Sequence, residues 1–220
     1  LHDVRPYGAG PAPPRAADAA GRLVCRQPGS PAARDAVQGC RRLGRADFRA
    51  QYGFAEHDVV ITQTGKFDHT KCLESALMAF CANPSPTIRF VIAGQMTEEV
   101  KTACTPLIQC DPRILDLGWQ SADGLRSVLA GADCFLQPFG QTVTTQMSMG
   151  YGCVILAQDV PSHRWLVGDK GYLFKDVSEL VHVFKWVVEN QARLIQLQQA
   201  TSQFAATHLD YRQLALQIVT

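Results

Sequence analysis

The segment VVITQTGKFDHTKC, residues 59–72, carries the strongest fold signal in the chain. It begins with the short apolar run Val59–Ile61 and turns polar before a glycine, Gly65. Two lysines, Lys66 and Lys71, follow that glycine at the predicted start of a helix. A buried strand that leads through a glycine into a helix is typical of the βα units of a parallel sheet.

The same alternation continues from about residue 46 onward. The sequence predicts strands over Val59–Ile61, Ile88–Ala93, Ile114–Leu117, Cys134–Leu136, Val154–Ala157 and Tyr172–Phe174. It predicts helices between them, over Lys71–Ala82, Glu98–Pro106, Ala122–Ala130, Val143–Gly150 and Ser162–Val167. Because strands alternate with helices, we predict an α/β fold, a Rossmann-like doubly wound parallel sheet with right-handed crossovers. Residues 176–220 read as two or three C-terminal helices.

Residues 1–45 differ in composition from the rest. They are rich in arginine, proline and alanine and contain neither lysine nor glutamate. We therefore predict an interdomain linker or poorly ordered tail over 1–45 and one domain over 46–220.

Composition limits the possible functions. The 220 residues are 46% hydrophobic, which is enough for one sizeable core, and the formal net charge is +1. This charge gives no general attraction to nucleic acid, so we expect no nucleic-acid partner. No run of about 18 apolar residues is present, as a membrane-spanning helix requires. The eight cysteines form no CxxC pair and no zinc spacing, so we predict reduced thiols and no bound metal.

The two lysines near Gly65 suit a diphosphate. An open α/β sheet binds its ligands at the carboxyl ends of the strands, where Gly65 permits close backbone approach and Lys66 and Lys71 can neutralise phosphates. Two solvated lysines would give the same sequence, so that alternative stays open. The chain has neither a Walker A motif nor GxGxxG, which argues against a P-loop nucleotidase and a dinucleotide oxidoreductase.

A second candidate loop follows the predicted strand Cys134–Leu136. Gly140, Gln141 and Thr142 precede the next predicted helix, whose free backbone N–H groups can take phosphate oxygens. The alternative is a simple N-cap cluster, with Thr142 capping the helix.

Read in order, these segments resemble the C-terminal, donor-nucleotide-binding domain of a GT-B glycosyltransferase of the group 1, or family 4, type. That family has a strand, then Gly-Arg, four residues and Lys; here Gly65-Lys66 and Lys71 keep the spacing, with lysine in place of arginine. The further matching segments are Phe90–Gly94, Ile114–Trp119, Leu129–Pro138, Met149–Ile155 and Gly168–Phe174. The resemblance covers about residues 46–220.

The resemblance implies a retaining hexosyltransferase that uses a nucleotide sugar as donor and needs no cofactor. It places the donor diphosphate at Gly65, Lys66, Lys71, Gly140, Gln141 and Thr142, and the ribose and base near Thr145, Leu117 and Gly118. GT-B enzymes work in a cleft between two domains, so an N-terminal acceptor domain is missing here and we expect weak or no transfer by this domain alone. The family also implies polysaccharide or glycolipid synthesis in the cytoplasm, and leaves open peripheral membrane association of the full-length protein.

The chain departs from the family at two glutamates. The family has two, eight positions apart, in the loop and helix after the proline, but no glutamate lies between Glu99 and Glu179 here. The second falls on Thr145 or on Met147, depending on which glycine ends the helix. With Thr145, which we prefer, the first falls on Gln137 or is lost because the loop is shorter than in the family. Thr145 can still hydrogen-bond a ribose hydroxyl, less strongly than a carboxylate does.

This departure keeps other functions open, and no catalytic residue can be assigned. One alternative is a catalytically degenerate, glycosyltransferase-like binding or scaffold module. A second is a UDP-N-acetylglucosamine epimerase, whose acidic and histidine catalysts we cannot place here. A third is an unrelated doubly wound α/β protein, because fold does not fix function.

Overall fold

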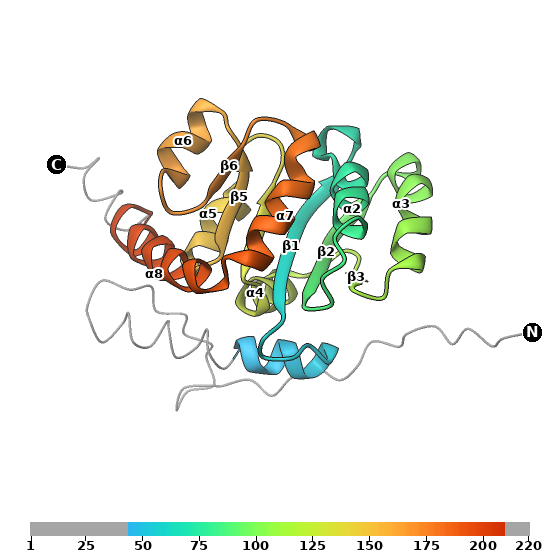
Figure 1. Ribbon diagram of the computed structural model, residues 1–220, viewed down its shortest axis with the longest axis horizontal. Helices are drawn as coiled ribbons and strands as arrows, with labels where there is room; N and C mark the ends of the chain where they lie inside the picture. Colours follow the sequence, from blue (N-terminus) through green and yellow to red (C-terminus); the bar gives the residue numbers. More distant parts are fainter. Residues whose placement is uncertain (1–43, 210–220) are drawn as a thin grey trace, which may run out of the picture.

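One parallel sheet organises the molecule. The structure is a computed structural model and describes residues 44–209. Within these residues six strands pair in the order β3-β2-β1-β4-β5-β6 (Figure 1). They are β1 (Val59–Phe67), β2 (Ile88–Met96), β3 (Ile114–Asp116), β4 (Cys134–Gln137), β5 (Val154–Gln158) and β6 (Tyr172–Phe174). All the pairs are parallel, which confirms the predicted doubly wound α/β class.

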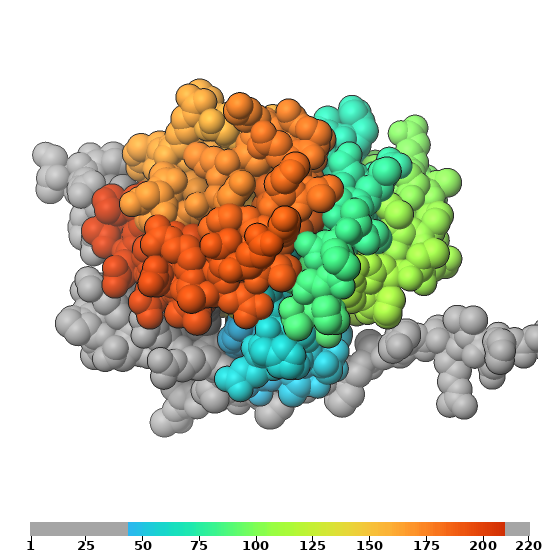
Figure 2. Space-filling model, viewed as in Figure 1, coloured from blue at the N-terminus to red at the C-terminus, as the bar shows by residue number. Residues whose placement is uncertain are grey.

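Helices cover both faces of the sheet. One face packs against α2 (Leu73–Cys81), α3 (Glu98–Cys110) and α7 (Leu180–Glu189), and Figure 2 shows this side of the molecule. The other face packs against a helix of residues 44–52, α4 (Ala122–Gly131), α5 (Val143–Gly150) and α6 (Pro161–Val167). The long α8 (Gln191–His208) gives Leu194 and Leu197 to the first core cluster and Ala205 to the second. Residues 44–209 therefore form two hydrophobic clusters, one on each side of the sheet.

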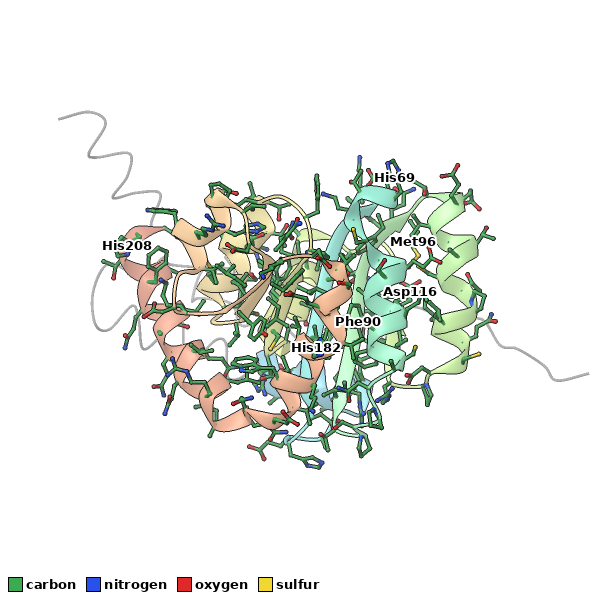
Figure 3. The ribbon with its side chains drawn as sticks, turned by 45° about the horizontal axis from the view of Figure 1, so that its top comes forward. His69, Phe90, Met96, Asp116, His182 and His208 are labelled. Carbon is green, nitrogen blue, oxygen red and sulfur yellow. The ribbon has the colours of Figure 1, made fainter. Side chains whose placement is uncertain are left out.

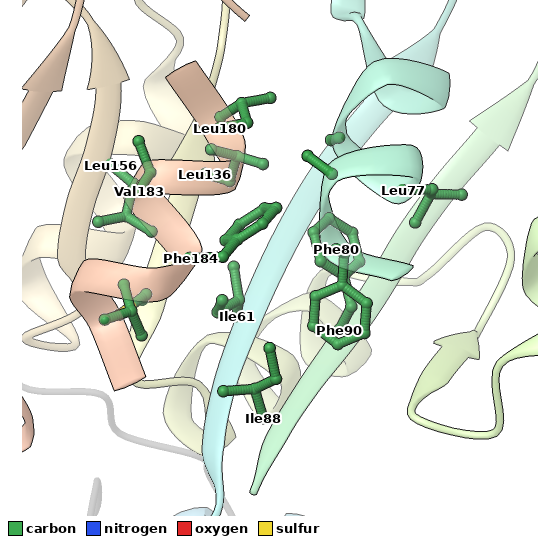
Figure 4. Packing of buried hydrophobic residues seen from close by; sticks show 14 of the residues in the cluster. Ile61, Leu77, Phe80, Ile88, Phe90, Leu136, Leu156, Leu180, Val183 and Phe184 are labelled. Carbon is green, nitrogen blue, oxygen red and sulfur yellow. The ribbon is translucent and has the colours of Figure 1, made fainter. Parts of the chain in front are cut away.

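Three phenylalanines form the centre of the first cluster. Phe80 of α2, Phe90 of β2 and Phe184 of α7 are fully buried and meet edge to face (Figure 4). Their ring centroids lie 5.4 to 6.3 Å apart. Burial of one such ring stabilises a fold by about 1.5–3 kcal/mol. These contacts join α2 and α7, which are distant in sequence, over the central strands.

The amino end of the sheet is closed by the helix of residues 44–52. Phe48 is buried and packs on Gly131, where an added Cβ would lie 2.1 Å from its ring. Arg49 bonds Asp133 at 2.5 Å. The predicted boundary between residues 45 and 46 thus falls inside a packed helix. Residues 1–43 and 210–220 lie outside the described residues, so the predicted character of the N-terminal segment stays a prediction.

The central strands are longer than the sequence predicted. β1 pairs with β2 through Phe67, so Lys66 lies on the strand, and the turn comes at Asp68 rather than at Gly65. Gly65 is still favoured as a glycine, because its φ of +134° is one that other residues rarely adopt, although a Cβ there would meet no atom within 4 Å. Its partner Gly94 is required for space, because an added Cβ would lie 1.8 Å from the Gly65 carbonyl oxygen.

The start of the next helix also differs from the prediction. Lys71 lies in η1 (His69–Lys71), a 3-10 turn that precedes α2, and not in the first turn of an α-helix. The side chain of Asp68 caps that turn, and Cys72 takes a left-handed conformation with φ of 52° between turn and helix. After β6 a second 3-10 turn, η2 (Val177–Glu179), leads into α7 and α8, which are the predicted C-terminal helices.

Within the part of the chain that the structure describes, no helix is both long and apolar enough to cross a membrane. In the same part of the chain, no disulfide joins the six cysteines.

Candidate functional site

A pocket lies where β1 and β4 separate. β1 pairs with β4 only at Ile61 and Thr62, whereas its pairing with β2 continues to Phe67. The two strands therefore diverge at their carboxyl ends, at the point where the strand order reverses, and open a cavity of about 260 Å³. It is lined by Gln63, Thr64, Gly65, Lys66, Asp68, Lys71, Gln137, Pro138, Thr142 and Thr144. Such a switch point is the usual ligand site of a doubly wound sheet.

Both predicted lysines line this pocket without a partner of opposite charge. Lys66 is exposed on β1 and Lys71 is half-buried in η1. Among residues 44–209, neither ammonium forms an ion pair with a carboxylate. The Lys71 Nζ lies 5.8 Å from the centroid of the Phe139 ring, which faces it from the other wall. Two unpaired cations in one concavity attract a ligand with more than one negative charge.

Asp68 adds one negative charge to the lining. Its carboxylate accepts from the Thr70 hydroxyl at 2.5 Å and from the Thr70 backbone N–H at 2.9 Å. The hydrogen bond from the Thr70 side chain lowers the pKa of Asp68, with Lys71 contributing in the same direction. Asp68 is therefore ionised at neutral pH, where its bonds hold the turn that carries Lys71.

The start of α5 forms the opposite wall. Thr142 and Thr145 make a capping box, in which the Thr142 hydroxyl accepts from the Thr145 backbone N–H at 3.3 Å. The backbone N–H groups of Val143 and Thr144 find no acceptor within residues 44–209. Thr142 therefore caps the helix, as one interpretation of this loop predicted. Binding of phosphate oxygens by the open N–H groups stays a prediction.

The two positions that the resemblance gives to glutamates hold buried, neutral side chains. The Gln137 amide donates to the carbonyl oxygens of Phe139 and Gly140 and so fixes the loop after β4. Thr145 is fully buried with its hydroxyl 3.1 Å from that of Thr142. Its role toward a ribose stays a prediction, since in this structure the hydroxyl belongs to the cap.

Other predicted residues lie outside the pocket. Leu117 and Gly118 follow β3, two strands away from β1, and the Gly118 carbonyl accepts from the Gly94 N–H at 2.8 Å. Gly140, with φ of +49°, and the exposed Gln141 shape the loop before α5 without lining the cavity. The pocket thus gathers Gly65, Lys66, Lys71 and Thr142 and does not gather the proposed base-binding residues.

Sequence reasoning missed the polar residues on the pocket floor. Gln63 and Thr64 belong to β1 and line the cavity. The sequence signal that could have revealed them is the change from the apolar run Val59–Ile61 to the polar run Thr62-Gln63-Thr64 within one strand. Polar residues in a central strand of a parallel sheet are unusual, because both faces of that strand are buried.

The histidines nearest this end of the sheet do not join the pocket. His69 is exposed and points outward (Figure 3). His163 is fully buried, with its Nδ1 2.7 Å from the Gln158 carbonyl oxygen. Over residues 44–209, no three His, Cys, Asp or Glu side chains are grouped in a way that could hold a metal ion.

Comparison with known proteins identifies the fold. No protein-family model and no curated protein sequence matches the chain. HepE of Anabaena, solved with UDP and glucose, superposes with a TM-score of 0.69 and 18% identity over 80% of this chain and 51% of that one. The C-terminal domain of LpcC, a group 1 glycosyltransferase of Francisella tularensis, gives 0.65 and 15% over 75% of this chain and 92% of that one. The chain has the fold of one half of a GT-B glycosyltransferase.

Other structures with this GT-B half-fold give the same result. WaaG, a glycosyltransferase involved in lipopolysaccharide biosynthesis, superposes with a TM-score of 0.64 and 15% identity over 75% of this chain and 47% of that one. The chain spans about half the length of HepE and WaaG and most of the LpcC domain. Identities this low establish a common fold, so activity has to be argued from the pocket.

Proposed function

We propose that this chain is the donor-binding half of a retaining glycosyltransferase. The observation that carries the proposal is the pair of unpaired lysines, Lys66 and Lys71, in the pocket at the switch point. A nucleoside diphosphate sugar would place its diphosphate between these ammonium groups and the open N–H groups of Val143 and Thr144. HepE supports this class of ligand, since it has been solved with UDP and with UDP-glucose.

The lysines would act in binding and in the chemical step. Cleavage of the bond between sugar and diphosphate leaves additional negative charge on the departing phosphate, and fixed cations stabilise that charge. Lys66 replaces the arginine of the family pattern and so acts as a point charge rather than as a bidentate ligand. In this proposal the lysines and the start of α5, rather than a metal ion, neutralise the diphosphate.

Transfer would also need an acceptor. We propose that acceptor binding lies on a second domain outside this chain, because GT-B enzymes work between two domains. Taken alone, the chain would then bind donor and transfer little.

A second candidate is a binding module that has lost catalysis. The observation that favours it is the use of Gln137 and Thr145 in buried protein contacts, where the family pattern has glutamates. Failure to bind any nucleotide would favour this module, whereas an enzyme binds the donor nucleotide and transfers a sugar once its second domain is supplied.

The role of the lysines predicts a selective loss of affinity. In Lys66→Ala and Lys71→Ala we expect the nucleoside diphosphate to bind about 10- to 100-fold more weakly, because hydrogen bonds to charged groups contribute about 1.5–3 kcal/mol. Affinity for the corresponding nucleoside should change little. Calorimetric titration with UDP and with uridine measures both.

The matched control is Lys185→Ala. Lys185 lies on α7 with an exposed side chain, so this variant removes one positive charge outside the pocket. It should bind UDP as the unmodified chain does. Equal losses for UDP and uridine in the pocket variants, or an equal loss in the control, would contradict the assigned role.

A further inference from the structure

Two buried polar atoms on the floor of the pocket have no partner. We infer that Gln63 and Thr64 recognise a hydroxyl group of the donor, an inference that rests on the proposed function. Gln63 is 3% exposed and lines the pocket, as Thr64 does. The Gln63 Oε1 and the Thr64 Oγ1 are buried and form no hydrogen bond within residues 44–209. Buried polar atoms almost always have partners, so an unpaired one in a pocket points to a ligand.

The orientation of the Gln63 amide is fixed by its other contact. Its Nε2 donates to the Lys71 carbonyl oxygen at 2.8 Å. A carbonyl oxygen only accepts, so the amide nitrogen must face it and the Oε1 must remain as the open atom. The same bond ties Gln63 to the turn that carries Lys71. The pocket therefore offers an acceptor beside a cation.

Comparison along β1 shows that these open atoms are particular to the pocket. Thr62 is the last β1 residue paired with β4, and its hydroxyl donates to the Val91 carbonyl oxygen at 3.0 Å. Thr64, on the same side of the strand, lies beyond that point and has no such bond. The Thr62 hydroxyl outside the pocket is therefore bonded, whereas the Thr64 hydroxyl in the pocket lining is open, although β1 stays paired with β2 through Phe67.

The open acceptor requires a hydrogen-bond donor from the ligand. The oxygens of an ionised diphosphate only accept, so they cannot satisfy the Gln63 Oε1. A nucleotide sugar brings O–H groups on its sugar and on its ribose, next to the phosphates that Lys66 and Lys71 would hold. The Thr64 hydroxyl both donates and accepts, so it fits the same class of group.

This arrangement replaces the acceptors that the family takes from glutamates. At those positions the Gln137 amide donates into its own loop and the Thr145 hydroxyl caps α5. Among residues 44–209, the buried side-chain atoms of this pocket that lack a partner therefore lie on β1.

The test compares ligands that differ in their hydroxyl groups. Gln63→Met and Thr64→Val each remove the open atom with little change in volume. Both variants and the unmodified chain are titrated calorimetrically with UDP, 2′,3′-dideoxy-UDP and UDP-glucose. We expect UDP-glucose to bind about tenfold more weakly to either variant, the loss that accompanies one hydrogen bond. Unchanged UDP affinity would assign the sugar hydroxyl. A loss for UDP that is absent for 2′,3′-dideoxy-UDP would assign a ribose hydroxyl.

Stability separates ligand recognition from a structural role. Thr64→Val removes a buried atom that has no partner, so its melting temperature should not fall below that of the unmodified chain. The matched control is Thr62→Val, which removes a bonded hydroxyl outside the pocket. It should melt at a lower temperature and keep its affinity for UDP-glucose.

Three results would overturn the inference: unchanged UDP-glucose affinity in both variants, equal losses for all three ligands, or a lower melting temperature for Thr64→Val. Equal losses would mean that the variants act by moving Lys71. If the unmodified chain binds GDP or ADP instead of UDP, the same comparison is made with that nucleotide, its dideoxy form and its glucose derivative. If it binds none of them, the proposed function itself fails and this inference fails with it.

Discussion

A pair of glycines sets the position of the first lysine. Gly65 and Gly94 face each other across β1 and β2, one residue before Lys66. The Gly94 position has no room for a side chain, because a Cβ there would lie 1.8 Å from the Gly65 carbonyl oxygen and 2.8 Å from the Phe67 ring. The end of β1, and with it Lys66, is therefore placed by backbone contact between two strands.

We predict that Gly94→Ala destabilises the fold and weakens nucleotide binding. The added methyl group must push the two strands apart, and overpacking of this kind costs about 1–3 kcal/mol. Urea unfolding, followed by titration with UDP under native conditions, measures both effects. The control is Gly150→Ala at the end of α5, where a Cβ meets no atom within 4 Å. This control should be neutral or slightly stabilising, and a Gly94→Ala variant as stable as the control would contradict the close packing.

The residue types predicted Lys66 and Lys71 in the pocket, but they did not predict Gln63 and Thr64 on its floor. Lys66 and Lys71 could be predicted because they follow a buried strand and a glycine, at the carboxyl end of a strand where an open α/β sheet binds its ligands. Gln63 could not, because its importance depends on the direction of its amide and on the point where β1 separates from β4. The sequence also predicted the turn at Gly65. A glycine is expected both at a turn and at a position of positive φ inside a paired strand, and the sequence does not distinguish the two cases.

The helix of residues 44–52 is attached to the sheet through one buried carboxylate. Asp133 bonds Arg49 at 2.5 Å and Arg45 at 2.8 Å, and it accepts from the Val60 backbone N–H at 2.9 Å. The Gln198 amide of α8 reaches the same carboxylate at 3.1 Å. Burial lowers the pKa of Arg49, and the charge of Asp133 opposes that shift. Asp133 thus joins elements from both ends of the described chain.

We predict that Asp133→Ala lowers the free energy of unfolding by about 3–5 kcal/mol, because it leaves a buried guanidinium without its partner. Chemical denaturation measures the loss. Asp123→Ala is the control, since Asp123 pairs with Arg126 on the surface with a side chain 73% exposed. Surface pairs contribute about 0–1 kcal/mol, so the control should change little. Similar effects for the two variants would argue against the anchoring role.

A second ion pair predicts a dependence of stability on pH. Asp111 accepts from the Arg113 guanidinium at 2.6 Å, at the turn before β3. This hydrogen bond lowers the pKa of Asp111 against a smaller opposing effect of burial. A carboxyl whose folded pKa is lowered stabilises the fold above its unfolded pKa, and that stability is lost as pH falls through the folded pKa.

The free energy of unfolding of the unmodified chain should therefore exceed that of Asp111→Asn by a constant amount near pH 7. The difference should shrink below about pH 4, near the pKa of a free aspartate. Urea unfolding of both proteins at a series of pH values tests this. A difference that stays constant down to about pH 3 would show that the Asp111 charge contributes nothing.

The presence of each strand and helix was easier to predict than the residues at which it begins and ends. All six strands and the five helices between them were predicted from the alternation of apolar runs with helical segments. In the structure Thr97 and Ser121 cap α3 and α4. The extension of β1 and β2 could not be predicted, because polar residues such as Thr64 and Gln95 continue the pairing there. The 3-10 turn before α2 depends on local hydrogen bonds of Asp68 that carry no periodic signal.

At the scale of the whole molecule, residues 44–209 have the fold of one half of a GT-B glycosyltransferase. Its pocket lies at the carboxyl ends of the strands, and its neighbours HepE and WaaG are about twice as long as the matched part. We predict that the chain alone transfers no measurable sugar from UDP-glucose to added saccharides or lipids, although it binds the nucleotide. A radiolabelled transfer assay tests this. Sugar transfer that Lys66→Ala/Lys71→Ala abolishes would show that this half is sufficient.

The central claim is that Lys66 and Lys71 form a diphosphate site. The most direct measurement is calorimetric titration of the chain with UDP, GDP and ADP, repeated with the Lys66→Ala/Lys71→Ala double variant. Lys185→Ala/Arg193→Ala serves as the control, because it makes the same change in net charge on exposed positions of α7 and α8. We predict saturable binding of one nucleotide to the unmodified chain and the control, and none to the pocket variant. Absence of binding for all three nucleotides, or binding that survives in the double variant, would contradict the assignment.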